Sequence, residues 1–136
     1  MAKAKNKKAL PKQVKLNEEK YNSDKHPPRF SFRFLIKHND FGFESLDNKH
    51  KTALANKMYR LSQMNWSMLR KDDRHGLGYE KINRKTLNFT LPDTVPSDTD
   101  IIAFRFHEKA PMLGYRSSFG TFYIIAFDSR FKAYNH

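Results

Sequence analysis

Hydrophobic residues alternate with other side chains in the segment FSFRFLI, residues 30–36. Phe30, Phe32, Phe34 and Ile36 occupy every second position. A period of two is typical of a β-strand, because successive side chains point to opposite faces of a sheet. The pattern predicts a strand over residues 30–36 with these four side chains on one buried face.

A helical spacing follows this segment. The apolar positions recur three or four residues apart, at Ala53, Leu54, Met58, Leu61 and Met64. Such a stripe predicts an amphipathic helix that packs on a core. Ser45 or Asp47 is a suitable N-cap, since either side chain can accept a hydrogen bond from the first turn.

A second, shorter helix is predicted from Asn65 through Trp66 and Leu69, with the Gly76-Leu77-Gly78 stretch beyond its end. Its polar end contains Asp72, Asp73 and His75. We interpret these three residues as a solvated surface, because adjacent carboxylates on a helix project in different directions.

Strand patterns dominate the second half of the chain. They predict a short strand over residues 79–82 and longer strands over 101–106, 112–116 and 121–127. The last strand is apolar on both faces, which indicates a central position in the sheet. We therefore expect an α+β fold in which an N-terminal strand and a helix pair pack on a mainly antiparallel C-terminal sheet.

The first 29 residues differ from the rest in composition. They carry nine Lys or Arg against three acids and few apolar residues, and they end at His26-Pro27-Pro28-Arg29. Such a segment cannot bury enough apolar surface to fold alone. It predicts a flexible basic arm over residues 1–29, either a solubilising tail or a phosphate-tracking arm, followed by one α+β domain over residues 30–136.

The charge and the composition narrow the function. A formal net charge of +12 and a pI near 10.0 favour an anionic partner, nucleic acid before an acidic protein or a membrane surface. The chain has no cysteine, and none of its six histidines has metal-ligand spacing. No P-loop, GxSxG or dinucleotide motif is present. No apolar run suits a membrane span or signal peptide, so we expect a cytoplasmic protein.

Arginines interrupt two of the apolar strands. Arg105 and Arg116 lie within them, and the tail adds Arg130, Lys132, Tyr134 and His136. A guanidinium cannot lose its charge, so it must be paired, reach water or hold an anionic ligand. Several such groups on one sheet surface would suit phosphate; the alternative for Arg105 is a structural ion pair with Asp128 or Glu108.

The order of elements resembles the RelE/ParE superfamily of bacterial toxins, which pack early helices against a C-terminal antiparallel sheet. The local likeness lies in Arg105 within IIAFRF, in Gly114-Tyr115-Arg116, in Tyr123-Ile124-Ile125 and in residues 128–134. The resemblance implies the toxin of a toxin–antitoxin system. Such a toxin acts as a metal-independent endoribonuclease, a hydrolase of messenger RNA, often at the ribosome, and a small acidic antitoxin neutralises it.

The resemblance also implies roles for the cationic and aromatic residues. Arg105 and Arg116 would clamp the phosphoryl oxygens, because a planar guanidinium contacts two oxygens together. His136 would exchange a proton, and Tyr134 would either donate a proton or orient a base by stacking. Arg130 and Lys132 would contact the RNA. This chemistry requires no metal or cofactor.

Two other functions remain open on the sequence. One is a non-enzymatic, basic RNA- or DNA-binding module, in which the arm supplies affinity and aromatic residues stack on bases. The other is a toxin of the same fold directed at gyrase, as in the ParE branch. For the antitoxin, an apolar groove along Leu54, Met58 and Leu61 is one possible contact, and core packing is the other use of that stripe.

Overall fold

The computed structural model describes residues 21–74 and 76–134, and it has an α+β fold. Five strands form one sheet in the order β1-β5-β4-β3-β2. They are β1 (Arg29–Ser31), β2 (Tyr79–Ile82), β3 (Ile101–His107), β4 (Ala110–Arg116) and β5 (Thr121–Phe127). Strand β1 runs parallel to β5, and the other three pairings are antiparallel. The predicted α+β class and mainly antiparallel sheet are confirmed.

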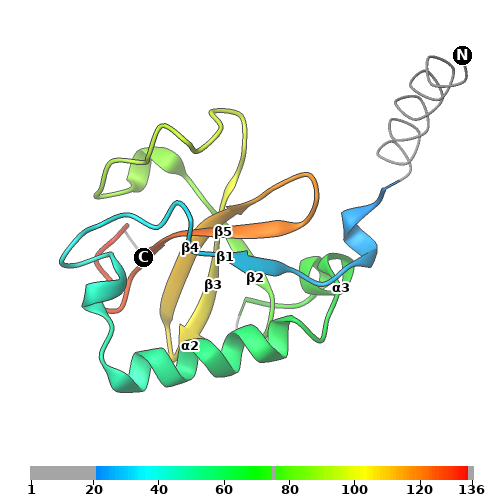
Figure 1. The fold of residues 1–136 in the computed structure, drawn as a ribbon, viewed down its shortest axis with the longest axis horizontal. Helices are drawn as coiled ribbons and strands as arrows, with labels where there is room; N and C mark the ends of the chain where they lie inside the picture. Colours follow the sequence, from blue (N-terminus) through cyan, green and yellow to red (C-terminus); the bar gives the residue numbers. More distant parts are fainter. Residues whose placement is uncertain (1–20, 75, 135–136) are drawn as a thin grey trace, which may run out of the picture.

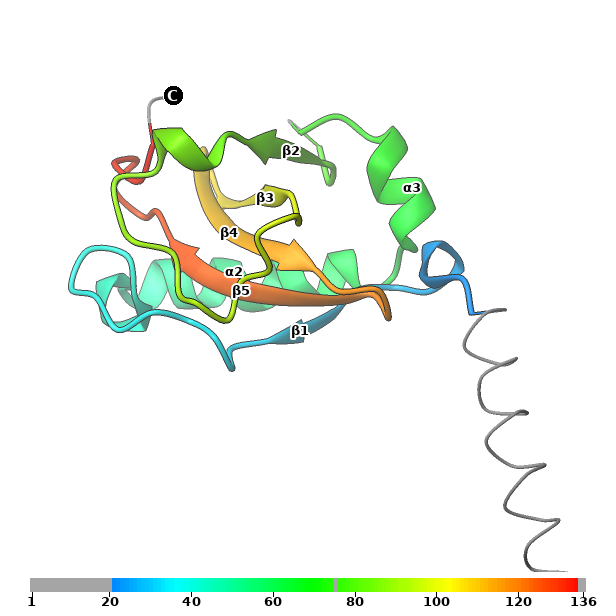
Figure 2. The same ribbon diagram turned by 90° about the horizontal axis from the view of Figure 1, so that it is seen from above.

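The two faces of the sheet are covered differently (Figures 1 and 2). Helix α2 (Asn48–Leu61) crosses below the sheet in Figure 1, and α3 (Trp66–Lys71) lies at one end. The connection between β2 and β3, which includes the 3₁₀ turn Arg84–Thr86, passes above the sheet. The fold therefore has a helix side and a loop side.

Each side of the sheet has its own core. The helix-side core includes Leu54, Leu61, Trp66, Phe104, Met112 and Phe122. The loop-side core includes Phe41, Ile101, Ala103, Leu113, Ile125 and Tyr134. Ile124 and Ile125 of β5 belong to different cores and are both fully buried. The predicted central position of this strand is confirmed.

The predicted helix pair is also confirmed. The Asp47 carboxylate accepts a hydrogen bond of 2.8 Å from the backbone N–H of His50, and it caps α2. Leu54 and Leu61 are buried in the helix-side core, and Met58 packs against it. The apolar stripe of α2 therefore packs in the core. The alternative prediction, an open groove for an antitoxin along this stripe, is wrong.

Local hydrogen bonds from side chains cap helix α3 at its start and organise the turn after its end. The Asn65 side chain accepts a bond of 2.8 Å from the backbone N–H of Met68. The Asp72 carboxylate accepts bonds of 2.8 Å from the N–H of Asp73 and 3.1 Å from that of Leu77. Asp72 thus organises the turn after α3, and His75 lies outside the described residues.

The first predicted strand is wrong in its length and its single buried face. Strand β1 ends at Ser31, because the chain then turns: the N–H of Leu35 donates to the carbonyl of Phe32 at 3.1 Å. Phe30 packs on the helix-side core, whereas Phe34 packs on the loop-side core. The turn carries the chain around the sheet edge, so one alternating run serves both faces.

Lys57 is a buried cation on α2, with 7% of its surface exposed. Its Nζ donates to the carbonyl of Gly76 at 3.2 Å. Burial, followed by the positive charge of Arg60, lowers the pKa of Lys57 to about 8, although Asp72 acts in the opposite direction. Lys57 is therefore a charge that folding disfavours at neutral pH.

Replacement of Lys57 by Met is expected to raise the free energy of unfolding at pH 7 by about 2 kcal/mol. This net gain already includes a loss of about 1 kcal/mol for the missing hydrogen bond to Gly76. Between about pH 8 and 10 the unfolded state of the wild type binds more protons at this site, so its stability rises with pH. The variant lacks that rise. Urea denaturation at both ends of this window measures the difference; a variant less stable than the wild type at pH 7 contradicts the assignment.

None of the helices in the described residues is long and apolar enough to cross a membrane.

Candidate functional site

Arg105 and Arg116 lie on opposite faces of the sheet. Arg105 follows Ala103 by two positions in β3 and pairs across the ladder with Pro111, on the loop side. Arg116 pairs with Phe122 of the helix-side core. The predicted clamp of both arginines on one phosphate is therefore wrong, because alternation along neighbouring strands separates the two side chains by the thickness of the sheet.

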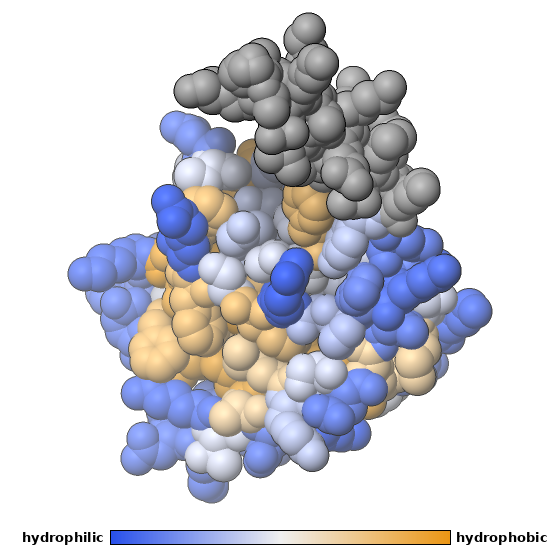
Figure 3. Space-filling model, turned by 45° about the vertical axis from the view of Figure 1, so that its right-hand side comes forward, coloured by the Kyte–Doolittle hydropathy of each residue, from blue (hydrophilic) through white to orange (hydrophobic). Residues whose placement is uncertain are grey.

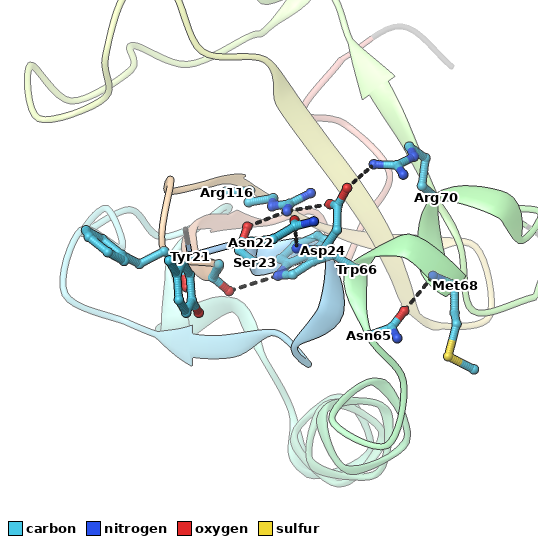
Figure 4. Close-up of polar contacts among 11 residues, drawn as sticks. Tyr21, Asn22, Ser23, Asp24, Asn65, Trp66, Met68, Arg70 and Arg116 are labelled. Atoms are coloured by element: carbon cyan, nitrogen blue, oxygen red, sulfur yellow. Dashed lines mark hydrogen bonds and ion pairs between the residues drawn. The ribbon is translucent and has the colours of Figure 1, made fainter. Parts of the chain in front are cut away.

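The guanidinium of Arg116 is held in place on the helix side (Figure 4). It lies 4.7 Å over the ring of Trp66 and forms an ion pair of 2.7 Å with Asp24. Asp24 also pairs with Arg70 at 3.1 Å. Hydrogen bonds from Arg116 and then Arg70 hold the pKa of the Asp24 carboxyl below its ordinary value, so the carboxylate stays charged at neutral pH. Arg116 here fastens the N-terminal segment to the sheet.

The same contacts correct the predicted boundary of the basic arm. The Tyr21 hydroxyl donates to the carbonyl of Phe119 at 2.9 Å, and the backbone N–H of Trp66 donates to that of His26 at 3.1 Å. Residues 21–29, predicted to be flexible, are thus bonded to the domain. The remaining part of the predicted arm, residues 1–20, lies outside the described residues.

Tyr134 lies on the loop side, at the end of a turn built by Asp128. The fully buried Asp128 carboxylate accepts bonds of 2.6 Å from the N–H of Lys132 and 2.9 Å from that of Ala133. Phe131 within this turn has a positive φ of 63°. The turn directs the Tyr134 ring into the loop-side core, where 7% of the residue is exposed.

The Tyr134 hydroxyl lies near two charged side chains from strands β2 and β3. It donates to Glu80 Oε1 of β2 at 3.4 Å, and the positive charge of Arg105 acts on it from β3. Burial raises the pKa of the Tyr134 phenol, and the negative charges of Glu80 and Asp128 raise it further, while Arg105 opposes them. We call this cluster the Glu80–Arg105–Tyr134 site.

Glu80 is oriented by the edge strand and by an arginine. It pairs across the ladder with Ala103, which puts its side chain on the loop side with Arg105. Its second oxygen forms an ion pair of 2.6 Å with Arg74, and 28% of its side chain is exposed. The site thus combines a solvent-accessible carboxylate, a guanidinium and a protonated phenol. This set can accept a proton, contact an anion and donate a hydrogen bond.

Sequence reasoning missed Glu80. The segment YEKI was predicted as a strand, and its alternation separates Glu80 from Tyr79 and Lys81. A carboxylate on a strand beside an arginine-bearing strand was the available signal. The register that sets Glu80 opposite Ala103 is not visible in the sequence.

The other predicted RNA contacts lie apart from this site. Arg130 forms an ion pair of 3.5 Å with Asp40 and lines a separate hollow of about 330 Å³. The Lys132 side chain is exposed, and its backbone N–H is bonded to Asp128. His136, a predicted catalytic residue, lies outside the described residues. Of the predicted residues that the structure describes, only Arg105 and Tyr134 come together.

The hollow beside Arg130 contains two histidines. The rings of His50 and His107 meet edge to face with centroids 4.7 Å apart. The Nδ1 atom of His50 lies 2.7 Å from the Asp47 carboxylate. Hydrogen bonds from the backbone N–H of His50 and then from its ring lower the pKa of Asp47. In the described part of the chain, no group of three His, Asp or Glu is arranged to hold a metal ion.

Exposed aromatic residues form a further surface feature. Phe32 and Phe43 are 46% and 43% exposed, with ring centroids 6.2 Å apart, and Lys51 Nζ lies 5.0 Å from the Phe43 centroid. Figure 3 shows hydrophobic side chains gathered on one face of the molecule among hydrophilic ones. Aromatic groups exposed beside cations are typical of contacts with a partner.

The fold and the site define an α+β protein with a mostly antiparallel five-stranded sheet and a charged cluster on its loop side. Comparison of the chain with protein-family models found no match. Comparison with the curated proteins and with the solved structures likewise found no match.

Proposed function

We propose that the protein is a RelE-like toxin that cleaves messenger RNA without a metal ion. The observation that supports this most directly is the convergence of Glu80, Arg105 and Tyr134, from three segments of the chain, on one end of the loop side. Each residue type suits one task of phosphodiester cleavage: proton acceptor, anion contact and hydrogen-bond donor.

In the proposed reaction Glu80 accepts the proton of the ribose 2′-OH. The 2′ oxygen forms a bond to phosphorus while the bond from phosphorus to the 5′ oxygen breaks. Arg105 offsets the charge that builds on the phosphoryl oxygens, because its fork can contact two of them. The products are a 2′,3′-cyclic phosphate and a 5′-hydroxyl.

Tyr134 supplies the proton for the leaving oxygen. Its raised pKa keeps the phenol protonated at neutral pH, and a phenol is still a stronger acid than the departing alkoxide. The same hydroxyl donates to Glu80 in the free protein, so it lies beside the proton acceptor. Acid and base are then neighbours, and Glu80 can return a proton to Tyr134 after each cycle.

The topology is consistent with the RelE-like part of the proposal. A helix pair from the first half of the chain packs on one face of a C-terminal antiparallel sheet, the order on which the resemblance rests. Strand β1 returns to pair with the last strand, which makes the N-terminal half part of the same sheet.

A small acidic antitoxin is the proposed protein partner. The net charge of +12 favours an acidic protein. The exposed pair Phe32 and Phe43 offers an aromatic anchor, and Lys51 places a cation beside it. This surface replaces the α2 stripe that the sequence suggested.

Incubation of the purified full chain with single-stranded RNA in EDTA is expected to yield fragments that end in a 2′,3′-cyclic phosphate. The chelator has no effect, because the proposed groups are all side chains. Mapping of the product ends checks this. Salt-dependent binding without product would instead select the non-enzymatic module, and inhibited gyrase supercoiling with intact RNA would select the ParE-like function.

A further inference from the structure

A second charged hollow lies on the helix side, where α3 meets β2, β3 and β4. Its volume is about 540 Å³, and its cations are Arg70, Lys81 and Arg116. Tyr79 and Ile102 supply an apolar part of its wall. A hollow of this size and mixed lining suits a ligand with a charged part and a flat apolar part.

Among the residues that the structure describes, the cations of this hollow outnumber the carboxylates paired with them. Asp24 pairs with both Arg70 and Arg116, and Asp100 pairs with Lys81 at 3.2 Å. The Lys81 and Asp100 side chains are 73% and 66% exposed. Ion pairs in that much water contribute little, so a phosphate can displace Asp100 at small cost. Asp24 meanwhile holds both guanidinium groups beside the hollow.

The hollow and the Glu80–Arg105–Tyr134 site are the two sides of one edge strand. In β2, Tyr79 and Lys81 pair with Phe104 and Ile102 on the helix side, whereas Glu80 faces the loop side. Strand β2 ends the sheet. A ligand that passes around this edge therefore reaches both sites. A flexible single strand can follow such a sharp path, but a duplex resists bending over so short a length.

The chain enters the described domain beside this hollow. The Tyr21 hydroxyl donates to the carbonyl of Phe119. Ser23 and Asp24 accept hydrogen bonds from Arg116, as Figure 4 shows. Seven lysines precede Tyr21 in the sequence. The sequence therefore adds further positive charge to that of the hollow, which favours a long polyanion over a small free anion.

We propose that this hollow is a phosphate-binding subsite for single-stranded RNA, located on the opposite side of β2 from the reacting phosphate. The inference rests on the proposed function, because that function supplies the RNA strand that crosses the edge. Arg70 and Lys81 contact backbone phosphate, Arg116 supports them, and a base lies against the wall formed by Tyr79.

The test uses the full chain with Glu80→Gln, so that RNA stays intact, and a fluorescein-labelled oligouridine as the probe. Arg70→Ala with Lys81→Ala is expected to weaken binding about ten- to hundredfold. The slope of log affinity against log salt is expected to fall by about 1.4, since each of the two lost phosphate contacts on a single strand removes about 0.7. Arg60→Ala with Lys85→Ala, a pair of exposed cations elsewhere, is the charge-matched control and is expected to weaken binding far less.

Fluorescence anisotropy at several salt concentrations measures both quantities. Equal losses in the test and control variants would overturn the subsite, and so would binding of duplex DNA as tight as that of oligouridine. Cleavage distinguishes the two proposals. If Arg70→Ala with Lys81→Ala, in a chain that retains Glu80, cleaves RNA with unchanged KM, the subsite fails alone. If the wild type cleaves no RNA but binding still depends on these cations, the proposed function fails and the binding site stands.

Discussion

Replacement of Glu80 by Gln is expected to lower the rate of RNA cleavage by about 10²- to 10⁴-fold, the usual contribution of a proton-transfer group. The amide keeps the shape of the side chain but cannot accept the 2′-OH proton. Arg105→Ala is expected to cost about 10²- to 10³-fold, because the charge on the phosphoryl oxygens then lacks its guanidinium. Single-turnover cleavage of a labelled RNA in EDTA measures both effects.

Two controls separate chemistry from folding. The ion pair of Glu80 with Arg74 is partly exposed, so Glu80→Gln is expected to lower the free energy of unfolding by less than about 1 kcal/mol. Glu44→Gln, at an exposed carboxylate elsewhere on the surface, is expected to cleave like the wild type. A folded Glu80→Gln variant with wild-type cleavage would remove Glu80 from the mechanism.

Replacement of Trp66 by Ala is expected to lower the free energy of unfolding by about 3–5 kcal/mol. Trp66 has no exposed surface, and its ring packs against Phe104 and Phe122 in the helix-side core. Its indole N–H donates to the carbonyl of Gly120 at 2.9 Å, and Arg116 stacks on its face. The substitution removes all of these contacts together. Urea denaturation followed by circular dichroism measures the loss.

Trp66→Phe tests the same site when the Ala variant does not fold. It keeps a ring for Arg116 and loses the indole N–H, so a smaller loss of about 1–2 kcal/mol is expected. Tyr59→Ala is the matched aromatic control, because Tyr59 is 68% exposed and its removal is expected to change stability by no more than about 0.5 kcal/mol. A loss below about 1 kcal/mol in Trp66→Ala would show that this ring does not support the core.

The helices and the central strands could be predicted because their signals are local. One helix and its cap contain both the Leu54-Met58-Leu61 spacing and Asp47. The continuous apolar run over residues 121–127 is enough to indicate a buried strand. The prediction for the N-terminal strand failed because the sequence alternates in the same way at Phe30 and Phe34 whether the chain stays in the sheet or turns around its edge. The hydrogen bond from the N–H of Leu35 to the carbonyl of Phe32 shows that the chain turns.

The candidate site was predicted in part for the same reason. Arg105 and Tyr134 could be predicted because a charge in an apolar strand and a polar, basic tail are local features of the sequence. Arg116 carried the same local signal, yet its partner Asp24 lies 92 positions away and fixes it on the other face. The signal for Glu80, a carboxylate on a predicted strand, was not sufficient, because its role depends on its register opposite Ala103.

The sequence by itself determined the α+β class, the helix pair, the central last strand and the strong positive charge, since period, capping and composition act within a few residues. The tertiary structure alone decided which arginine faces which side of the sheet and which carboxylate meets each one. Those outcomes depend on strand register and on contacts between distant segments, and a one-residue change of register would reverse every face.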